Sequence, residues 1–393
     1  MSEPDFPDFD VAVVGAGLVG LVSALALEHH GQRVALIDAA ALAGRPDPRA
    51  SFLARSSERL LDRLGVTVER QSVSAVLAAE GVPGRPVGRG SLQFEPQDAD
   101  DLGAVVENEA LRQALLQRLS SSDVTAREGV RVEDIDPQPS LATLLTDAGD
   151  ITAKLIVAAD GRNSPLRRLS GIGVERHDYN QRALTFTLAH TTPHKGAAYQ
   201  VFFPGGPLAL LPLTDDRSSV VWTDTPAAIR AAEALDTDAL AAELRYRIGD
   251  TLGDLAILDT PASYPLEQRL ATELTSARLA LVGDAAHVIH PLAGQGINLG
   301  FRDAAALADT VREAASLGQD IGGPALSGYG RWRRGDIGGM ATVTDALLHA
   351  YRLPGALGSA RRTVTSLIDA SPLRGWLSRE AAGERPNLPS LMA

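Results

Sequence analysis

The 393-residue sequence has no cysteine, few aromatic residues and fewer basic than acidic residues. The absence of cysteine excludes disulfides, thiolate metal sites and iron–sulfur clusters, and fits a reducing compartment. Lysine and arginine number 37 against 49 acidic residues, which gives a net charge of −12. Because a nucleic-acid-binding protein needs a basic surface, this charge argues against such a partner. The first ten residues also lack the basic region of a secretory signal. The composition therefore predicts a cytoplasmic globular protein.

Long hydrophobic runs are also scarce, and the one at residues 11–27 has another explanation than a membrane span. It contains Gly15, Gly17 and Gly20 at GxGxxG spacing, and its length is at the short limit for crossing a bilayer. We interpret it as a buried strand over residues 10–15, a tight turn and a helix to about residue 31. A second strand then ends at Asp38, where a carboxylate could accept hydrogen bonds from a ribose. The pattern predicts a dinucleotide site at the N-terminus.

A second glycine-rich stretch, GDAAHVIHPLAGQGINLGFRD, covers residues 283–303. A strand-like run precedes it and a helix-like run follows, an arrangement that presents backbone N–H groups to an anionic or polar ligand. His287 and His290 lie three residues apart, which does not fit HExxH, and no further ligand cluster completes a metal site. We therefore expect no metal, and we interpret both histidines mainly as packing or supporting residues. The stretch predicts contact with the reactive end of the same cofactor.

A third motif, KLIVAADGRNSPLRR at residues 154–168, is typical of a strand that ends in Asp160 and Gly161. The order GAGLVG, ADGRNSPLR and GDAAHVIHPLAGQG resembles the triple signature of the group A FAD-dependent aromatic hydroxylases. Within that group, HPLAGQGINLGFRD resembles the signature of the ubiquinone-biosynthesis hydroxylases at every fixed position. Further similar stretches, from RASFLARSSERLLDRLGV to YGRWRRGD, extend the resemblance over nearly the whole chain.

The resemblance implies an α/β fold with a Rossmann-like FAD-binding domain of the para-hydroxybenzoate hydroxylase type, an inserted β-sheet substrate domain and a C-terminal helical tail. We expect the FAD-binding domain to comprise residues 1–67, 105–180 and 276–323. The β-rich substrate-binding domain would comprise residues 68–104 and 181–275, where apolar alternation and turn signals favour strands, and the helical region residues 324–393. Candidate pocket walls in the second domain, for which core packing is the commoner role, are Phe186, Phe202, Phe203 and Trp222.

The resemblance also implies the site residues. Asp284 is expected to hold the ribitol hydroxyls of FAD, and Asp38 stands where the family more often has Glu. The residues expected to bind the cofactor are Gly15, Gly17, Gly20, Asp38, Arg49, Arg112, Asp160, Gly161, Gly283, Asp284 and Asn298. The catalytic candidates, expected to face the isoalloxazine ring, are Pro291, Gly294, Gln295 and Gly296. From the residues alone, Asp160 could instead cap a turn, and Arg167 and Arg168 could be a solvated face.

The function implied by the resemblance is that of an FAD-dependent monooxygenase. It would hold FAD non-covalently and use NAD(P)H as a transient reductant and O2 to hydroxylate the aromatic ring of a polyprenylated phenol in ubiquinone biosynthesis, through a flavin C4a-hydroperoxide. In such chemistry the protein orients the ring, excludes water and supplies fixed donors. Three alternatives stay open: a hydroxylase of another aromatic metabolite, a flavin oxidoreductase of the same fold without oxygen insertion, and a lipid-carrier relative without flavin.

The C-terminal region carries the signals for partners. Arg361 and Arg362 lie among apolar residues, and such a basic amphipathic stretch suits peripheral contact with an inner membrane. A homodimer or a complex of ubiquinone-biosynthesis enzymes would use the same surface equally well. Gly335, Gly338 and Gly339 lower the helix propensity of the preceding stretch, which indicates a close helix contact there. The hydroxylated carbon, the prenyl length and the choice between NADH and NADPH stay undetermined.

Overall fold

A computed structural model describes residues 7–44, 47–87, 92–94, 101–352, 383 and 387–393 of the chain. Arg361 and Arg362, which the sequence suggests for membrane contact, lie outside the described residues. Among the described residues, no helix combines the length and the apolar character that a bilayer span requires. The apolar run at residues 11–27 divides into a strand and a helix, because its glycines form the turn between them.

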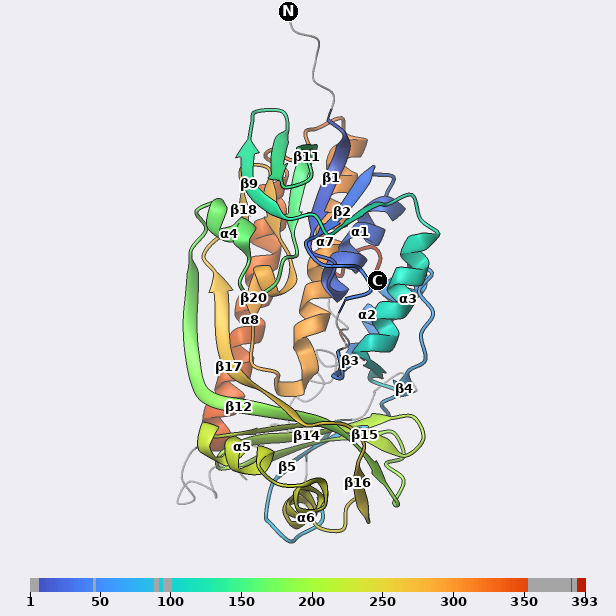
Figure 1. Cartoon of the computed structure of the whole chain (residues 1–393), viewed down its shortest axis with the longest axis vertical. Helices are drawn as coiled ribbons and strands as arrows, with labels where there is room; N and C mark the ends of the chain where they lie inside the picture. The colour runs from blue at the N-terminus through green and yellow to red at the C-terminus, as the bar shows by residue number, and fades with distance from the viewer. Residues whose placement is uncertain (1–6, 45–46, 88–91, 95–100, 353–382, 384–386) are drawn as a thin grey trace, which may run out of the picture.

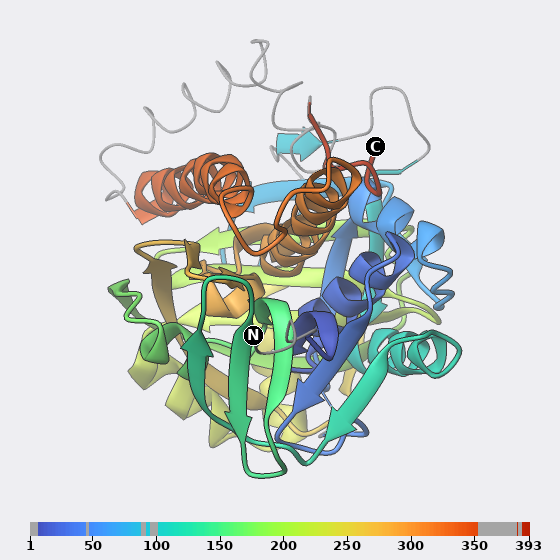
Figure 2. The same ribbon diagram turned by 90° about the horizontal axis from the view of Figure 1, so that it is seen from above.

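The first sheet, which we call sheet A, is built around parallel strands in the order β19-β11-β1-β2-β8. Its central strands are almost continuous runs of buried Val, Ile, Leu and Ala, as expected for a parallel sheet covered on both faces. Helices α1, α3 and α7 pack beside it (Figure 2). The bounds are β1 Phe9–Val14, α1 Leu18–His29, β2 Val34–Asp38, α3 Asn108–Ser120, β8 Thr125–Glu128, β9 Val132–Pro137, β10 Ala142–Thr146, β11 Ile151–Ala158, β18 Thr275–Ser276, β19 Leu279–Leu281 and α7 Gln295–Ser316.

A second, mainly antiparallel sheet of nine strands, which we call sheet C, crosses below sheet A in Figure 1. Helices α5 and α6 cover its far face, and a core that contains Phe186, Phe203 and Trp222 fills the space between them. The bounds are β5 Ala75–Glu80, β6 Leu92–Phe94, β12 Val174–His190, β13 Ala197–Phe203, β14 Gly206–Leu213, β15 Arg217–Asp224, α5 Pro226–Glu233, α6 Thr237–Ile248, β16 Leu255–Ile257, β17 Ala262–Ala271 and β20 His287–Val288.

Shorter elements connect these two sheets. A three-stranded sheet, β3-β7-β4, lies beside the start of α7, and the long helix α8 runs along α7 toward sheet C (Figure 1). The bounds are β3 Ala50–Ala54, α2 Arg55–Arg63, β4 Gln71–Ser72, β7 Gly103–Glu107, α4 Pro165–Leu169, η1 Gly283–Ala285, η2 Leu292–Gly294 and α8 Leu326–Arg352.

The strand β12 crosses the expected division at residues 180 and 181. It begins at Val174, pairs there with Ala271 of β17, and changes register between Asp178 and Gln181. A sequence boundary placed at a composition change cannot detect such a continuous ladder, because both halves of β12 are ordinary strand sequence. We retain the three-part division of the chain as a proposal, with β12 shared by its first two parts.

The expected close helix contact at the α8 glycines is absent from the described structure. Gly335, Gly338 and Gly339 are exposed, and a Cβ added at any of them would have none of the described atoms within 4 Å. Helix α8 instead meets its neighbours through the opposite face, where Tyr329 and Arg333 are fully buried. Helix α8 tolerates the three glycines on its exposed face because packing of the opposite face stabilises the helix.

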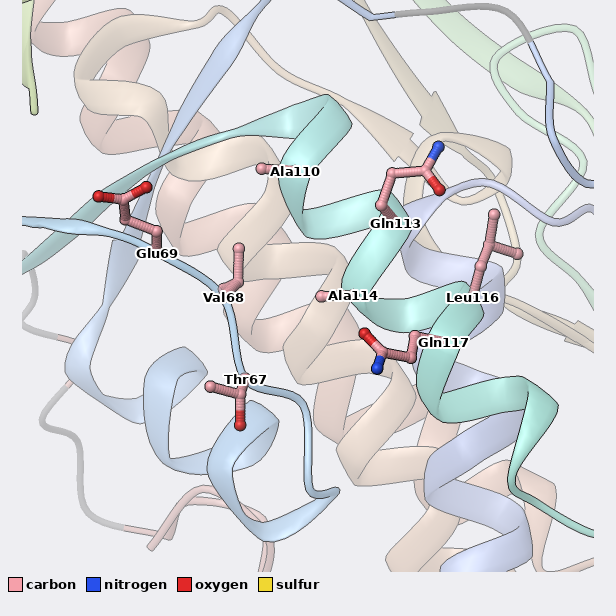
Figure 3. Close-up of a pocket in the computed structure, with 8 residues that line it drawn as sticks. All are labelled: Thr67, Val68, Glu69, Ala110, Gln113, Ala114, Leu116 and Gln117. Carbon is pink, nitrogen blue, oxygen red and sulfur yellow. The ribbon is translucent and has the colours of Figure 1, made fainter.

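Residues 387–393 return to the body of the molecule. The backbone N–H of Ser390 donates to Asp309 Oδ2 at 2.6 Å, and Arg59 donates to the Met392 carbonyl at 2.8 Å. Met392 is completely buried. A surface hollow of about 480 Å³ lies between residues 67–69 and one face of α3 (Figure 3). None of the predicted site residues lines it.

Candidate active site

The three motifs found in the sequence follow neighbouring strands of sheet A. The loops after β1, β11 and β19 leave the carboxyl ends of adjacent parallel strands, which is where ligands bind to open α/β sheets. Backbone bonds from Ala159 N–H to Val14 O (2.8 Å) and from Val282 N–H to Ala158 O (3.0 Å) place the three loops side by side. Beyond them β20 pairs with β17 of sheet C, so the loops lie between the two sheets.

The three glycines of the first motif have different structural roles. Gly15 has a φ of 106°, and a Cβ there would lie 2.3 Å from the Ala159 carbonyl oxygen. A Cβ on Gly20 would lie 1.8 Å from the Gly15 carbonyl oxygen, so strand and helix could not approach as they do. Gly17 has an ordinary φ of −70° and, among the described atoms, no neighbour within 4 Å of an added Cβ. Gly15 and Gly20 are needed for packing, whereas Gly17 leaves open space at the start of α1, where a phosphate would be stabilised.

Asp38 lies directly beside this loop. Its Oδ2 accepts the Ala16 N–H at 2.6 Å and its Oδ1 accepts the Ala40 N–H at 2.8 Å. The carboxylate thus holds the glycine-rich turn against the end of β2, at the position expected for ribose recognition.

The second loop leaves one carboxylate oxygen without a protein partner. Asp160 Oδ2 accepts the Leu166 N–H at 3.0 Å at the start of α4, so the capping alternative accounts for this oxygen. Oδ1 is buried and has no hydrogen-bond partner within the described part of the chain. Burial raises the pKa of Asp160, although hydrogen bonds from Ser164 and Leu166 oppose this effect. Next to it, Gly161 has a φ of 82°. A buried oxygen in this state is able to accept a hydrogen bond from a bound ligand.

The interpretation of Arg167 as a solvated residue is wrong. Its side chain is buried, and its guanidinium donates to the Ala285 carbonyl at 2.6 Å and to the Arg162 carbonyl at 3.0 Å. It therefore ties the second loop to the third. The neighbouring Arg168 is exposed, as the sequence interpretation expects.

The third loop exposes a carboxylate among charged neighbours. Asp284 is exposed, although the residues on either side, Gly283 and Ala285, are buried. Arg49 pairs with Asp47 at 2.7 Å, and this hydrogen bond raises the pKa of Arg49, with smaller contributions from Tyr264 and Asp284. Arg49 and Asp284 are thus close enough to interact electrostatically, as their predicted shared site requires.

Arg112 has a different environment from Arg49. It donates to the carbonyls of Leu42 and Ala43 and so holds the loop that follows β2. Any contact of Arg112 with a cofactor stays a prediction.

The start of α7 presents backbone donors. Gly294 has a φ of 64°, Gln295 begins the helix, and Gly296 is exposed with none of the described atoms within 4 Å of an added Cβ. The first N–H groups of a helix have no intrahelical acceptor, and the exposed Gly296 lies among them, where a ligand can approach it. Pro291, which is half-buried, precedes the short helix η2 that leads into this turn.

The Asn298 side chain is occupied by the protein. Its Oδ1 accepts from Ala54 N–H (2.9 Å) and Ser57 Oγ (2.8 Å), and its Nδ2 donates to the Phe52 carbonyl (2.8 Å). The side chain joins α7 to β3 and α2 and thereby fixes the direction of the α7 N-terminus. If Asn298 contributes to cofactor binding, as predicted, its side chain does so by orienting the start of α7.

An apolar cluster faces these loops from sheet C. Phe202, the neighbour of the core residue Phe203, points to the opposite face of the sheet and packs with Leu292 of η2. Tyr264 is partly buried against the same cluster. Of the four candidate wall residues, only Phe202 lies on this side, while the other three pack in the core with α5 and α6. The cluster consists of Tyr179, Ala183, Phe202, Leu266, Leu292 and Leu348.

Sequence reasoning missed several residues that organise this region. Tyr179 donates to Asp345 Oδ1 at 2.7 Å across 166 positions. His287 Nε2 lies 2.5 Å from Asp303 Oδ2, and Arg333 Nε lies 2.6 Å from Asp303 Oδ1. This agrees with the expectation that His287 supports the structure. No spacing rule signals such pairs, since Asp303 stands in an otherwise ordinary helical run.

The residues present fit FAD. Open space at Gly17 and Gly296, the orphaned oxygen of Asp160 and the exposed Asp284 carboxylate form a row of polar and open positions from the start of α1 to the start of α7. A long ligand with a pyrophosphate, a polyol and a flat ring matches that sequence of environments. Within the described ranges, no group of three or more potential ligand side chains is arranged to hold a metal ion.

The sheet arrangement and this site together define a flavin-dependent monooxygenase. Residues 8–318 match the FAD binding domain family, and the chain belongs to this family and, within it, to the ubiquinone-biosynthesis hydroxylases. The chain is 38% identical to ubiquinone hydroxylase UbiL of Rhodospirillum rubrum, over 98% of this chain and 92% of the relative. It is also 38% identical to 3-demethoxyubiquinol 3-hydroxylase of Escherichia coli, over 79% and 81% respectively.

Solved structures agree on the fold. The p-nitrophenol 4-monooxygenase PnpA of Pseudomonas putida superposes with a TM-score of 0.78 at 21% identity, over 96% of this chain and 99% of the other. PqsL of Pseudomonas aeruginosa, a probable FAD-dependent monooxygenase, gives a TM-score of 0.77 at 22% identity, over 92% and 100%. The predicted α/β architecture is therefore confirmed, while the individual site residues stay predictions.

Proposed function

We propose that this protein uses FAD, NAD(P)H and O2 to hydroxylate the aromatic ring of a polyprenylated phenol in ubiquinone biosynthesis. The observation that carries the proposal is that the apolar cluster around Phe202 includes Leu292 of η2, which leads directly into the start of α7, where Gly296 is open. An aromatic ring between them would contact apolar side chains on one side and backbone donors on the other. The names of the two curated relatives support a ubiquinone precursor as the substrate.

Bound FAD would supply the activation of O2 after reduction by NAD(P)H. The chain's own residues have three tasks around it. The amides at the start of α7 supply fixed donors at the reacting end, where developing negative charge would be stabilised. Phe202, Leu292 and Tyr264 exclude water from the apolar side. Asp284 and the Asp160 Oδ1 atom accept hydrogen bonds from the cofactor's hydroxyl groups.

The proposed substrate also bears on location. A polyprenyl tail partitions into lipid, so the protein must collect its substrate at a membrane surface or from a lipid-carrying partner. We therefore propose a cytoplasmic protein that associates peripherally with the inner membrane, alone, as a homodimer or in a complex of ubiquinone-biosynthesis enzymes. With a net charge of −12, attraction to an anionic bilayer must come from a local surface.

Lipid analysis of a deletion strain tests the substrate. We expect ubiquinone to be lost and one polyprenylated precursor to accumulate, with both effects reversed by the wild-type gene. An unchanged quinone profile would contradict the proposed pathway and favour another aromatic metabolite as substrate.

Oxygen labelling tests the reaction itself. With the accumulated precursor, NAD(P)H and 18O2, we expect one labelled oxygen atom in the product for each NAD(P)H consumed. NAD(P)H oxidation without a hydroxylated product would instead identify the flavin oxidoreductase alternative. A purified protein that neither contains nor binds flavin would identify the lipid-carrier alternative.

A further inference from the structure

One buried carboxylate holds both ends of the loop that carries Asp284. The Asp303 Oδ2 atom accepts the backbone N–H of Gly283 at 2.9 Å, and the same atom lies 2.5 Å from His287 Nε2. Gly283 begins η1 and His287 begins β20, so the two residues lie on either side of the short segment that contains Asp284. Asp303 comes from the middle of α7 and is 0% exposed. A single atom therefore fixes the two points between which Asp284 lies.

The second oxygen of Asp303 is bound just as firmly. Arg333 of α8 places its Nε 2.6 Å from Asp303 Oδ1, and its other nitrogens donate to Asp336 and to the Leu299 carbonyl. Burial by itself raises the pKa of Asp303, but the charges and hydrogen bonds of His287 and Arg333 outweigh it and lower the pKa. Asp303 thus stays ionised, and a buried ion with all its partners in place resists movement because each lost bond is costly.

Within the turn, the remaining freedom is small. Gly283 has a φ of 58°, and a Cβ there would lie 3.0 Å from the Val19 side chain of α1. The Ala285 carbonyl accepts from Arg167 at 2.6 Å. With both ends and one carbonyl fixed, Asp284 projects its carboxylate from a rigid frame into the exposed space of the site.

We propose that Asp303 is a positioning residue for FAD binding, which acts through Gly283 and His287 to set the place of the Asp284 carboxylate. The inference rests on the FAD site of the proposed function and not on the identity of the substrate. A carboxylate fixed before binding loses little conformational entropy when it accepts hydrogen bonds, so its contribution to affinity depends on the frame that holds it. If Asp303 acts in this way, its effect on FAD affinity requires Asp284.

A double-mutant cycle on FAD binding tests this dependence. FAD is titrated into the apo forms of the wild type, Asp284→Ala, Asp303→Asn and the double variant, with flavin fluorescence as the readout. Asparagine keeps the shape and one acceptor but removes the charge. We expect each single variant to lose about tenfold in affinity, because hydrogen bonds to a charged group are lost or misplaced. The double variant should bind within about twofold of Asp284→Ala, since the two residues are coupled.

The matched control is Asp309→Asn. Asp309 lies on the same helix and is also paired, with Ser390 and Arg312, but it does not touch the turn. Its FAD affinity should equal that of the wild type. Thermal unfolding of each apo-protein shows how far a variant is merely less stable.

Asp303→Asn removes one of the two carboxylates that pair with the buried Arg333, and this loss could prevent folding. In that event His287→Phe replaces it in the cycle, because this change removes one end of the frame and keeps the Asp303 to Arg333 pair. His287→Gln retains a side-chain N–H donor and should restore most of the affinity lost in His287→Phe.

Two outcomes would overturn the inference. Losses that multiply to about a hundredfold in the double variant would mean that Asp303 and Asp284 act independently. Wild-type affinity in Asp284→Ala would refute the proposed contact of that carboxylate and, with it, the path from Asp303. Neither result depends on turnover, so a failure of the proposed hydroxylation would be recognised separately.

Discussion

The substitution Gly17→Ala separates the space needed by the cofactor from the space needed by the fold. Gly17 has a φ of −70° and a ψ of 175°, which alanine adopts without strain, and no described atom lies within 4 Å of the added Cβ. Alanine is a poorer N-cap than glycine, while the loss of glycine lowers the entropy of the unfolded chain; these effects oppose each other at about 1 kcal/mol each. The free energy of unfolding of the apo-protein should therefore differ from that of the wild type by no more than about 1 kcal/mol.

FAD binding by Gly17→Ala should be much weaker. A methyl group at the start of α1 keeps a pyrophosphate from approaching the helix amides, where a charge-assisted hydrogen bond contributes about 1.5 to 3 kcal/mol. The loss of one such bond corresponds to a roughly tenfold to hundredfold higher dissociation constant. The assay is titration of the apo-protein with FAD, beside chemical denaturation of the same sample.

Two further variants make the result interpretable. Gly20→Ala places its Cβ 1.8 Å from the Gly15 carbonyl oxygen, so it should destabilise the apo-protein by about 3 kcal/mol or more. Gly339→Ala adds a methyl group on the exposed face of α8 and should leave FAD affinity unchanged. Its free energy of unfolding should change by no more than about 1 kcal/mol. Wild-type FAD affinity in Gly17→Ala would refute the placement of the pyrophosphate at this turn.

Three other predictions concern the cofactor, the apolar wall and a buried acid. The purified protein should be yellow, with about one FAD per chain released on denaturation, because the chain has no cysteine for a thioether link; flavin retained on the denatured chain would contradict this. Phe202→Leu should raise KM for the aromatic substrate, while Phe203→Leu should lower stability by about 1 to 2 kcal/mol and leave KM unchanged; equal KM effects would refute the assigned faces. Burial, together with Asp101 and Asp62 and against the charges of Arg70 and Arg55, raises the pKa of Glu58 from 4.5 to about 7. The stabilisation that comes from this raised pKa is complete below about pH 4.5 and is lost as the pH rises through 7. Between pH 5.5 and 8.5 the loss amounts to about 2 kcal/mol, and Glu58→Gln should abolish it; denaturation curves with the same pH dependence as the wild type would refute the shift.

The N-terminal part of the site could be predicted from the sequence because its signals are local. Gly15, Gly17, Gly20 and Asp38 lie within one strand, turn, helix and strand, and each has a geometric requirement that a short pattern expresses. The exposure of Asp284 between buried neighbours also agrees with its motif. For these residues, the local sequence pattern and the position at the end of a strand were sufficient to predict their place in the structure.

The supporting contacts could not be predicted in the same way. The bond between His287 and Asp303 spans 16 positions, and the contact of Arg167 with Ala285 spans 118. Such pairs depend on how helices and loops meet in space, and either residue alone is compatible with a solvated surface. Phe202 and Phe203 show a similar limit, because alternation in a strand gives two faces without saying which one meets the ligand.

The β12–β17 ladder has a mechanical consequence. The two strands stay hydrogen-bonded from Val174 and Ala271, near sheet A, to Thr185 and Ala262, in sheet C, so they form a stiff strut between the sheets. Bending such a strut elsewhere would break paired backbone bonds, but the register shift between Asp178 and Gln181, with Asn180 at a φ of 51°, already interrupts the ladder. Bending of this strut is thus concentrated at the register shift. Tyr179 lies at this register shift, donates a hydrogen bond to Asp345 of α8 and belongs to the apolar cluster around Phe202, so the interruption of the ladder and that cluster share a side chain.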